Sequence, residues 1–427
     1  MKIGLDITAL QTGHRMRGIG YTIINFINNI NARENKNNIF FFYAYKDSEG
    51  DPFELLNIAN LNHKIIYIEN HGANKNNGAI GKRLSNMFST ESKILFGDKR
   101  IKNFYDIDIF IQPDQNMPLP PKHKVKSVLF LYDIIPYTMK EDYLWDYKTA
   151  RINGKSRKGA VRHSILRSQY LRMLKANCKR TDKLIAISQK TKDDFIQYLV
   201  VSPKSITVCP LGVDKKVYDK KVDIEIYKQV ITGWGYRKEL LDLNNKEYLL
   251  FIGGVDPRRK LSELIAAFNN LRARGVNIYL VLAGDSLFGS KDIPNAEINK
   301  YLANTSYKDY IYFLGFTSDT QRDWLYANAL AFVYPSVYEG FGLPVLESMV
   351  QGCPVIAYKN AAVFEVAGDA AIYTKPNNFI GIINAVDSII KNKNIRNEKI
   401  IVGNTKAQEF SWDKTSEEIL KTSLQKN

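Results

Sequence analysis

Residues 329–352 read ALAFVYPSVYEGFGLPVLESMVQG, a strand pattern that passes through a bend into a helix pattern. The apolar run 329–336 has the composition of a buried strand. Residues 343–352 have helical periodicity and close on a glycine, which is a common helix terminator. Glu339 lies in the glycine-rich bend and Glu347 lies about one turn inside the helix. A buried strand that leads through a bend into a helix is the repeating unit of a parallel α/β sheet.

The same unit recurs along the whole chain, because short apolar runs alternate with segments of helical periodicity. Near-continuous apolar character favours strands that are covered by helices on both faces of a parallel sheet. We therefore predict an α/β fold built from doubly wound parallel sheets. The candidate strands are KIGLDIT, IFFFYAY, KIIYIE, IDIFIQ, VLFLYD, KLIAIS and SITVCP, followed by YLLFIGG, VNIYLVLAG, YIYFLG, ALAFVYPS, CPVIAY and AAIYT.

The length of 427 residues favours two domains, since a single hydrophobic core rarely grows to that size. The boundary is expected after residue 214, where a charged stretch over about 215–247 precedes the next buried strand. Residues 70–105 are rich in Asn, Gly and Lys, and they are expected to form a long loop or an insertion in the first domain.

Ligands of open parallel sheets bind at the carboxyl ends of the strands, where loops lead into helices. Three such junctions carry unusual residues, and the first places Gly18 and Gly20 at the start of a helix. Glycine lets backbone amides come close to a ligand, and the helix dipole there favours an anion. Turn geometry alone would explain these glycines equally well.

The second junction follows Gly253-Gly254 and reads DPRRK. Asp256 and Pro257 are typical of a helix N-cap and first turn, and three cations follow in the opening of the helix. Cations at this end oppose the helix dipole, so a bound anion such as phosphate would relieve an unfavourable arrangement. The alternative is that the side chains extend into solvent. The three cations are Arg258, Arg259 and Lys260.

The third junction is the bend of residues 339–342 and the helix that follows it. Its backbone amides would point at whatever binds the helix start, and the carboxylates of Glu339 and Glu347 can accept hydrogen bonds from sugar or ribose hydroxyls. Acid–base catalysis by this pair is less natural, because nothing fixes the two carboxyls at the distances that glycoside hydrolases use. The plainer alternative is that the glycines turn the chain and the glutamates face water.

Taken together, these segments resemble the family 4 retaining glycosyltransferases of the GT-B fold, also called glycosyl transferases group 1. The resemblance covers nearly the full chain except residues 50–105 and 140–175. It implies two Rossmann-like domains that face a cleft, with 1–214 and 412–427 forming an acceptor-binding domain and 215–411 a nucleotide-sugar-binding domain. The segments that carry it are RGIGY, AISQKTKDDF, SPKSITVCPLGVD, GGVDPRRK, VLAGD, FLGFTSD, PSVYEGFGLPVLESMVQGCPVIA and FSWDKTSEEIL.

The resemblance also implies roles for individual residues. Arg259 and Lys260 would hold the donor diphosphate with help from Arg258, and Glu347 would bind ribose hydroxyls. Glu339 would contact the transferred sugar where positive charge develops. Further donor contacts are expected from Gly340, Phe341, Gly342, Leu343, Gly18, Gly20, Gly284 and Phe316.

One departure from the family pattern lies after the strand VLFLYD. Many family members carry His-Asp at this point, whereas this chain carries Tyr132-Asp133. Both residues are predicted to be catalytic together with Glu339, although a tyrosine in place of histidine puts proton transfer in question. Asp133 would contact the sugar or the acceptor, and the alternative is that it caps a loop at the strand end.

The resemblance implies a reaction without metal or cofactor, in which cationic side chains and helix dipoles stabilise the leaving diphosphate. In agreement, no DxD pair of acids follows a strand to hold Mg²⁺. The predicted function is retaining transfer of a hexose from a nucleotide-sugar, with UDP favoured, to a glycan, lipid-linked glycan or glycoprotein in cell-surface polysaccharide or glycoconjugate synthesis. The alternatives are a GT-B nucleotide-sugar epimerase and, with less support, a nucleic-acid-binding protein.

Positive charge is concentrated in the first half of the chain. The net charge is +16, and residues 1–214 hold 33 Lys and Arg against 20 Asp and Glu. Residues 148–180 hold eleven basic residues and no acidic one, which indicates an anionic partner, although a solvated helix face is the plainer reading. We expect this segment to contact an anionic membrane surface, and we expect no nucleic acid partner. Its predicted packed face consists of Val161, Ile165, Leu166, Tyr170, Met173 and Leu174.

The cellular location of the protein is predicted from the absence of several sequence signals. The three cysteines have no metal-ligand or redox-pair spacing. Asp6 interrupts the N-terminal apolar stretch, and no apolar run approaches the roughly 18 residues of a membrane-spanning helix. We therefore expect a cytoplasmic protein, peripheral on the inner face of the cell membrane if the basic segment binds lipid.

Overall fold

The computed structural model describes residues 1–15, 17–32, 37–46, 51–68, 106–117, 119, 125–214, 243, 246–284, 287 and 296–425. The chain divides into two compact units, Met1–Gly212 with Trp412–Asn427 (unit 1) and Val213–Ser411 (unit 2). The sequence predicts this boundary after residue 214. The predicted loop, residues 70–105, lies outside the described residues, as does most of the charged stretch before the second unit.

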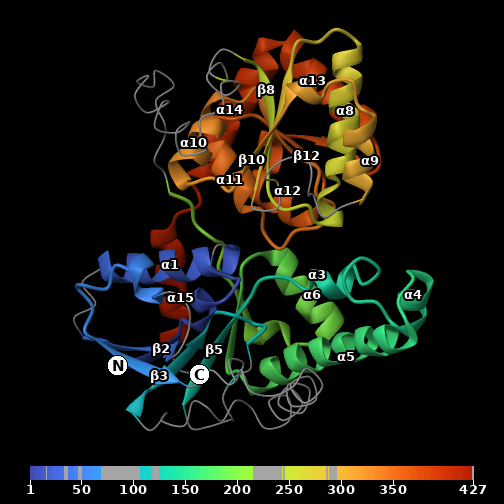
Figure 1. Ribbon diagram of the computed structural model, residues 1–427. Coiled ribbons are helices and arrows are strands. Elements are labelled where there is room, and N and C mark those ends of the chain that lie inside the picture. Colours follow the sequence, from blue (N-terminus) through green and yellow to red (C-terminus); the bar gives the residue numbers. More distant parts are fainter. Residues whose placement is uncertain are drawn as a thin grey trace. The chain divides into compact units, whose positions relative to one another are not determined.

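Unit 1 is built on a sheet of seven parallel strands in the order β3-β2-β1-β4-β5-β6-β7 (Figure 1). The strand order reverses direction between β1 and β4, which is where open α/β sheets bind their ligands. The strands are β1 (Lys2–Asp6), β2 (Ile39–Tyr45), β3 (His63–Ile68), β4 (Ile109–Gln112), β5 (Lys126–Leu131), β6 (Lys183–Ala186) and β7 (Ile206–Val208).

Helices cover the faces of this sheet, and the last helix of the chain is among them (Figure 1). The Trp412 ring packs edge-on against Tyr21 with 5.8 Å between the ring centroids, and the Thr415 hydroxyl donates to the Pro210 carbonyl at 2.7 Å. The helices are α1 (Gly18–Ala32), α3 (Ile135–Thr138), α4 (Tyr147–Ile152), α5 (Arg157–Arg180), α6 (Gln189–Leu199) and α15 (Trp412–Leu424), with the short 3-10 helices η1 (Thr8–Gln11), η2 (Pro52–Leu55) and η4 (Pro203–Ser205).

Unit 2 is built on a sheet of six parallel strands in the order β10-β9-β8-β11-β12-β13. The strands are β8 (Tyr248–Ile252), β9 (Tyr279–Ala283), β10 (Ile311–Gly315), β11 (Ala331–Tyr334), β12 (Val355–Tyr358) and β13 (Ala371–Thr374). The helices are α8 (Leu261–Ala273), α9 (Ala296–Asn304), α10 (Asp319–Asn328), α11 (Leu343–Val350), α12 (Ala361–Ala367), α13 (Phe379–Lys391) and α14 (Lys393–Ala407), with η7 (Pro257–Arg259), η8 (Lys308–Tyr310) and η9 (Gly368–Ala370).

The prediction of two doubly wound parallel sheets is confirmed. Every candidate strand of the sequence forms a strand, and all strand pairs among the described residues are parallel. Among the central strands, β11 is buried along its whole length and β8 along all but its last residue, which agrees with their uninterrupted apolar sequences. Such strands leave only their ends and loops for contact with a ligand.

One prediction about α5 is wrong. Val161 and Leu166 were expected on its packed face, but 48% and 45% of their respective surfaces are exposed. Leu174, further along the same helix, is buried as expected. Helical periodicity identifies residues that share a face, but it does not say how far along the helix another element covers that face.

No helix among the described residues combines the length and apolar character needed to cross a membrane.

Candidate functional site

Three neighbouring strands of unit 2 end in glycines whose backbones pack against each other. Gly253, Gly284 and Gly315 have positive φ angles of 153°, 147° and 69°. The Gly284 amide donates to the Gly315 carbonyl at 2.7 Å, and a Cβ atom on Gly284 would lie 2.1 Å from the Gly253 carbonyl oxygen. This contact requires glycine at 284 for packing alone, so its predicted donor contact stays a prediction.

The basic turn after β8 differs from its predicted form. Asp256 takes the predicted N-cap position with Pro257 in the first turn, but its side chain makes no cap hydrogen bond and pairs instead with Arg258 at 2.9 Å. The residues that follow form the 3-10 helix η7, and α8 begins only at Leu261. Lys260, between the two helices, is left-handed with φ 41° and ψ 41°. The expectation that all three cations lie within the opening of the long helix is therefore wrong, since the two arginines lie in η7.

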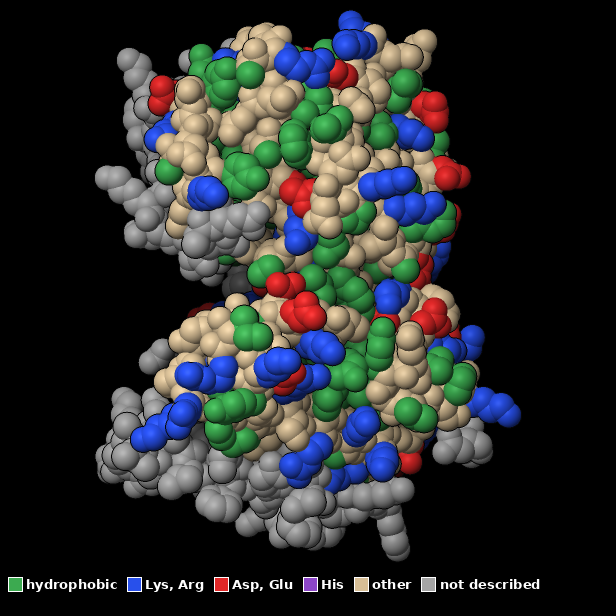
Figure 2. Space-filling view, turned by 90° about the vertical axis from the view of Figure 1, so that its right-hand side faces the viewer, with side chains coloured by type: hydrophobic (Ala, Val, Ile, Leu, Met, Phe, Trp, Pro, Cys, Tyr) green, Lys and Arg blue, Asp and Glu red, His purple; other side chains and the backbone are tan. Residues whose placement is uncertain are grey.

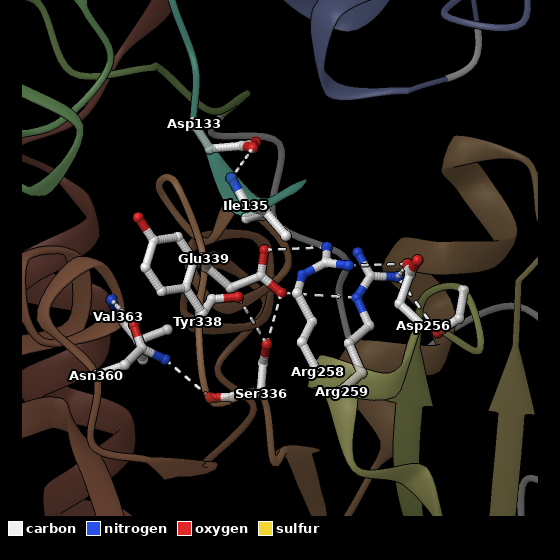
Figure 3. A network of polar contacts seen from close by, with 11 residues as sticks. Asp133, Ile135, Asp256, Arg258, Arg259, Ser336, Tyr338, Glu339, Asn360 and Val363 are labelled. Carbon is white, nitrogen blue, oxygen red and sulfur yellow. Dashed lines mark hydrogen bonds and ion pairs between the residues drawn. The ribbon is translucent and has the colours of Figure 1, made fainter. Parts of the chain in front are cut away.

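Glu339 lies at the centre of a network that joins this basic turn to the bend (Figure 3). Its carboxylate is 3.4 Å from Arg258 Nη2 and 3.6 Å from Arg259 Nε, and it accepts a hydrogen bond from Ser336 Oγ at 2.8 Å. The Arg259 guanidinium lies over Gly253, where a Cβ atom would come within 2.6 Å of Nη1. A side chain at 253 would therefore crowd the Arg259 guanidinium, and Ser336 adds a hydrogen bond to the Glu339 carboxylate.

The surroundings of Glu339 keep it charged. Burial alone would raise the pKa of this carboxyl, which is 8% exposed, but Arg258 and Arg259 bring the pKa below its ordinary value. Arg258 is itself buried and also pairs with Asp256. The network therefore holds two guanidinium groups and two carboxylates in fixed positions beside a helix start.

The bend itself is held from the opposite side by Asn360 (Figure 3). The Asn360 amide donates to the Ser336 carbonyl at 2.9 Å, and its oxygen caps α12 by accepting from the Val363 amide at 3.0 Å. Gly342 is left-handed with φ 114° and forms the N-cap of α11. A residue with a Cβ atom would be strained at that point, so the bend depends on this glycine.

The other predicted donor contacts near the bend differ in how far they are exposed to solvent. The Phe341 side chain is buried and packs edge-on against Phe410 at 5.9 Å, which leaves only its backbone for a ligand. Gly340 is also buried, and Leu343, the first residue of α11, is half-buried. Phe316, after β10, has 53% of its surface exposed, so its ring is accessible.

Glu347 forms a second network with α10, a helix that the sequence did not connect with the site. Its carboxylate lies 3.5 Å from Arg322 Nε and accepts a hydrogen bond from Tyr326 Oη at 3.3 Å. Arg322 also pairs with Asp319 at 3.0 Å and with Asp323 at 3.7 Å. The guanidinium therefore lies among three carboxylates, in contrast to the balanced charges around Glu339.

This excess of acid changes the titration of Glu347, which is 9% exposed. Burial raises its pKa, Asp319 and Asp214 raise it further, and Arg322 and Tyr326 only partly oppose them. The pKa of Asp323 rises to about 6 for similar reasons, burial first. Each of these carboxyls can therefore exchange a proton at a higher pH than an ordinary carboxyl.

Arg322 and Tyr326 are the functional candidates that sequence reasoning missed. They lie one turn apart in the segment TQRDWLYANA, whose pattern predicted only a helix. A capping box between Ser318 and Gln321 starts α10 at Asp319 and so sets the rotation of these side chains. An arginine and a tyrosine at i and i+4 are common on any helix, so no signal in the sequence would have identified them.

In unit 1, the two predicted glycines have different surroundings. Gly20 is packed against the preceding loop, where a Cβ atom would lie 2.2 Å from the Arg15 carbonyl oxygen. Gly18 begins α1 as predicted, and a Cβ atom there would meet nothing within 4 Å. Packing therefore explains the glycine at 20, whereas the described structure leaves room for a side chain at 18.

Tyr132 and Asp133 directly follow β5, and hydrogen bonds to their backbones hold them in place. The Tyr132 amide donates to Gln115 Oε1 at 2.8 Å, and its carbonyl accepts from Thr191 Oγ1 at 2.5 Å. Burial and the nearby Asp114 carboxylate raise the pKa of the Tyr132 hydroxyl far above its ordinary value, so it stays protonated. Asp133 Oδ1 accepts from the Ile135 amide at 3.0 Å, which is the loop-capping role considered from the sequence (Figure 3).

Among the described residues, no group of three or more His, Cys, Asp and Glu side chains lies in an arrangement that could hold a metal ion.

The comparisons with known proteins agree with this architecture. Residues 234–406 match the family model described as Glycosyl transferases group 1. O-antigen chain mannosyltransferase B of Escherichia coli is 31% identical over 166 residues, which are 39% of this chain and 42% of that protein. The serotype-specific mannosyltransferase WbdA of Escherichia coli is 24% identical over 437 residues, 97% of this chain and 47% of that protein. The chain thus spans less than half the length of these relatives.

Among solved structures, Anabaena Alr3699/HepE in complex with UDP and glucose has a TM-score of 0.65, with 18% identity and coverage of 99% of both chains. At that identity the likeness shows the fold, which is the GT-B architecture of two Rossmann-like domains.

Proposed function

Residues 234–406 are a glycosyl transferases group 1 region, and from this premise we propose that the chain is a retaining hexosyltransferase that uses a nucleotide-sugar donor. The observation that carries the proposal is the pair of buried glutamates on either side of one helix start. Glu339 is joined to the two arginines of the basic turn, and Glu347 is joined to Arg322 and Tyr326. One bend thus presents a cationic side and a hydrogen-bonding side to one ligand.

The donor is proposed to bind along this bend. Arg259 and Lys260 would take the diphosphate with help from Arg258, because guanidinium and ammonium groups are the usual partners of phosphate oxygens. Glu347 would accept hydrogen bonds from the ribose hydroxyls, and Glu339 would face the sugar. The remaining contacts are proposed for the backbone of the bend and for accessible neighbours: Gly340, Phe341, Gly342, Leu343, Gly284 and Phe316.

Transfer is proposed to proceed without metal or cofactor. As the bond between the sugar and the phosphate breaks, negative charge grows on the leaving diphosphate and positive charge grows on the sugar. Fixed cations and helix-start amides stabilise the former, and the ionised Glu339 stabilises the latter. A phosphate oxygen of the leaving group takes the proton of the attacking hydroxyl, which approaches from the same face, so the configuration is retained.

The acceptor is proposed to bind unit 1, where Tyr132 and Asp133 remain the predicted catalytic residues. Gly18 and Gly20 remain predicted contacts of the donor. Because the Tyr132 hydroxyl stays protonated, it can donate a hydrogen bond but cannot serve as a base near neutral pH. The names of the relatives in Escherichia coli support mannose as the first sugar to test and cell-surface polysaccharide synthesis as the setting. The solved complex with UDP and glucose supports a UDP-sugar as an alternative donor.

The proposed place of action is the cytoplasm. A lipid-linked glycan acceptor would bring the enzyme to the inner face of the cell membrane, whereas a glycan or glycoprotein acceptor would not. The glycosyltransferase proposal holds in either case, because Glu339 and Glu347, the two residues that carry it, belong to unit 2.

A donor screen tests the proposal. Melting curves with UDP-glucose, GDP-mannose and ADP-glucose should show a higher melting temperature with one of them, since a ligand that binds only the folded state stabilises it. That donor should then be hydrolysed slowly in the absence of acceptor. The control is Glu398→Gln, which changes a glutamate that lies 61% exposed on α14 and should leave both results unchanged. No shift and no hydrolysis with any nucleotide-sugar would contradict the proposal.

A further inference from the structure

The hairpin of α4 and α5 exposes both charge and apolar surface. All eight residues from 151 to 158 are exposed, and they connect the two helices of this part of unit 1 (Figure 1). The α4–α5 surface is defined here by the exposed residues Tyr147, Lys148, Arg151, Ile152, Lys155, Arg157, Lys158, Val161, Arg162 and Leu166.

The apolar members of this surface lie outside any core. Ile152 is 75% exposed, and Tyr147, Val161 and Leu166 are each between 43% and 48% exposed. Scattered exposed apolar side chains are normal on a soluble protein, but four within twenty residues of one hairpin form a group. Two of them were expected to pack inward, so their exposure is a property of the fold and not of the sequence pattern.

The charge of the α4–α5 surface has one sign. Between residues 148 and 180 there are eleven basic residues and no acidic one. Asp146, the acid just before this segment, caps α4 through the Thr149 amide and pairs with Arg167 at 3.5 Å. The first turn of α5 begins with Arg157 and Lys158, an arrangement that the helix dipole disfavours. An anionic partner would offset this cost.

We propose that the α4–α5 surface docks on an anionic lipid bilayer, with its Lys and Arg side chains at the phosphate headgroups and Ile152 and Val161 inserted between them. Peripheral membrane proteins combine these two features, whereas contacts with nucleic acid phosphates need the charge alone. Trp145 and Tyr147 at the base of the hairpin are the residue types that collect at membrane interfaces. Figure 2 shows this side of the molecule, where Lys and Arg side chains lie among hydrophobic ones over unit 1.

The proposal goes beyond sugar transfer and does not depend on it. Residues 140–175 also lie outside the segments that carry the family resemblance, so docking would not follow from that resemblance. If the enzyme acts on a lipid-linked acceptor, docking would hold unit 1 at the surface that carries the acceptor. The binding experiment uses no sugar donor, so its failure would leave the proposed transfer reaction standing.

The test is sedimentation of the full chain with vesicles of phosphatidylcholine, alone or mixed with phosphatidylglycerol, over a series of salt concentrations. Wild type should sediment with the anionic vesicles at low salt and remain in solution with the neutral ones. Lys158→Glu with Arg162→Glu should weaken binding by about tenfold or more, because each cation near the surface contributes separately. Glutamate suits a helix start, so these changes should leave α5 folded.

A second variant tests the contribution of the apolar side chains, and a third serves as a control for the change in net charge. Ile152→Ser with Val161→Ser should weaken binding several-fold and make the remaining binding more sensitive to salt. Lys375→Glu with Lys393→Glu changes the net charge equally on exposed residues of unit 2 and should bind as wild type does. Absence of binding to anionic vesicles at low salt would overturn the proposal, as would equal loss in the unit 2 control.

A parallel measurement with a single-stranded RNA oligonucleotide addresses the other anionic partner. Salt-sensitive RNA binding that the α5 variant abolishes, together with no vesicle binding, would identify nucleic acid as the partner and overturn membrane docking. Vesicle binding that is unchanged in the serine variant would overturn the insertion of Ile152 and Val161.

Discussion

Glu339 and Glu347 are similar in burial and lie eight residues apart, yet their surroundings shift their pKa values in opposite directions. Two arginines and a serine hydroxyl surround Glu339, and its pKa is lowered. One arginine, shared with two other acids, faces Glu347, and its pKa is raised despite a tyrosine hydrogen bond. Burial raises the pKa of both carboxyls, so the difference in pKa comes from the balance of neighbouring charges.

The contrast in pKa indicates different roles for the glutamate in the bend and the glutamate in the helix that follows it. A carboxylate that stays ionised beside fixed cations is suited to stabilising charge that develops during a reaction. A carboxyl among other acids is suited to accepting and sharing hydrogen bonds with hydroxyl groups of a bound ligand. This is the physical basis for assigning the sugar to Glu339 and the ribose to Glu347.

The largest effect is expected from Glu339→Gln. Removing the charge near the sugar should lower donor hydrolysis and transfer by about 100- to 1000-fold. Nucleotide affinity should stay the same or increase, because each of the two arginines then loses its ion pair with Glu339 and can interact more strongly with phosphate. Turnover and nucleotide affinity are measured separately on the folded variant, and turnover within tenfold of wild type would remove the assignment.

Lys260 tests the cationic side of the bend without disturbing a buried pair. Lys260→Gly should weaken nucleotide binding by about tenfold, since it removes one charged contact to the diphosphate. The same change should raise the melting temperature, because glycine adopts the positive φ of this position without strain. Calorimetric titration and a melting curve give the two results, and a loss of stability without a loss of affinity would contradict both statements.

Arg322→Met should enlarge the difference in pKa between Glu339 and Glu347. Without the guanidinium, the pKa of Glu347 should rise further, so the carboxyl would stay protonated to a higher pH. Nucleotide affinity should then fall by about tenfold near neutral pH and recover as the pH increases. Affinity is measured across pH for this variant and for Arg274→Met, which removes an arginine paired with Asp387 at 2.7 Å on another surface. Identical pH profiles for wild type and Arg322→Met would contradict the positioning role of Arg322.

The smallest effect concerns stability. The pKa of Asp323 is raised from 3.8 to about 6, so the folded state holds a proton that the unfolded chain has already lost. The unfolding free energy should therefore decrease as the pH rises from about 4 to about 6, by roughly 2 kcal/mol from this group. Asp323→Asn should flatten that decrease. Melting temperatures over this pH range measure it, and an unchanged slope would show that Asp323 titrates normally.

The sequence predicted the fold well because its strands are uninterrupted apolar runs, and such runs form parallel strands wherever helices cover both faces. It also located the bend of residues 339–342 and the basic turn, since strand ends and glycines mark them. The sequence did not predict side-chain contacts that depend on how a helix is rotated, or exposure that depends on how much of a helix its neighbours cover. The network of Arg322 and Tyr326 depends on how α10 is turned against α11, and the exposure of Val161 depends on how far α5 extends beyond its packing partners.

Asp256 takes the predicted N-cap position, but its side chain does not make the capping hydrogen bond. The Asp-Pro pair is a good local signal for a helix start. In the folded chain, however, two arginines compete for the same carboxylate, and its side chain pairs with them instead of capping the helix. Local capping preference gave way to ion pairs within the turn itself.

The most direct test of the central claim is calorimetric titration of UDP into Glu339→Gln and Glu347→Gln under identical conditions, or of the nucleotide that the donor screen selects. We predict that Glu347→Gln loses about 10- to 100-fold in affinity, because the ribose loses hydrogen bonds to a buried charged group. We predict that Glu339→Gln binds at least as tightly as wild type. Unchanged affinity in Glu347→Gln, or an equal loss in both variants, would contradict the division of roles between the two glutamates.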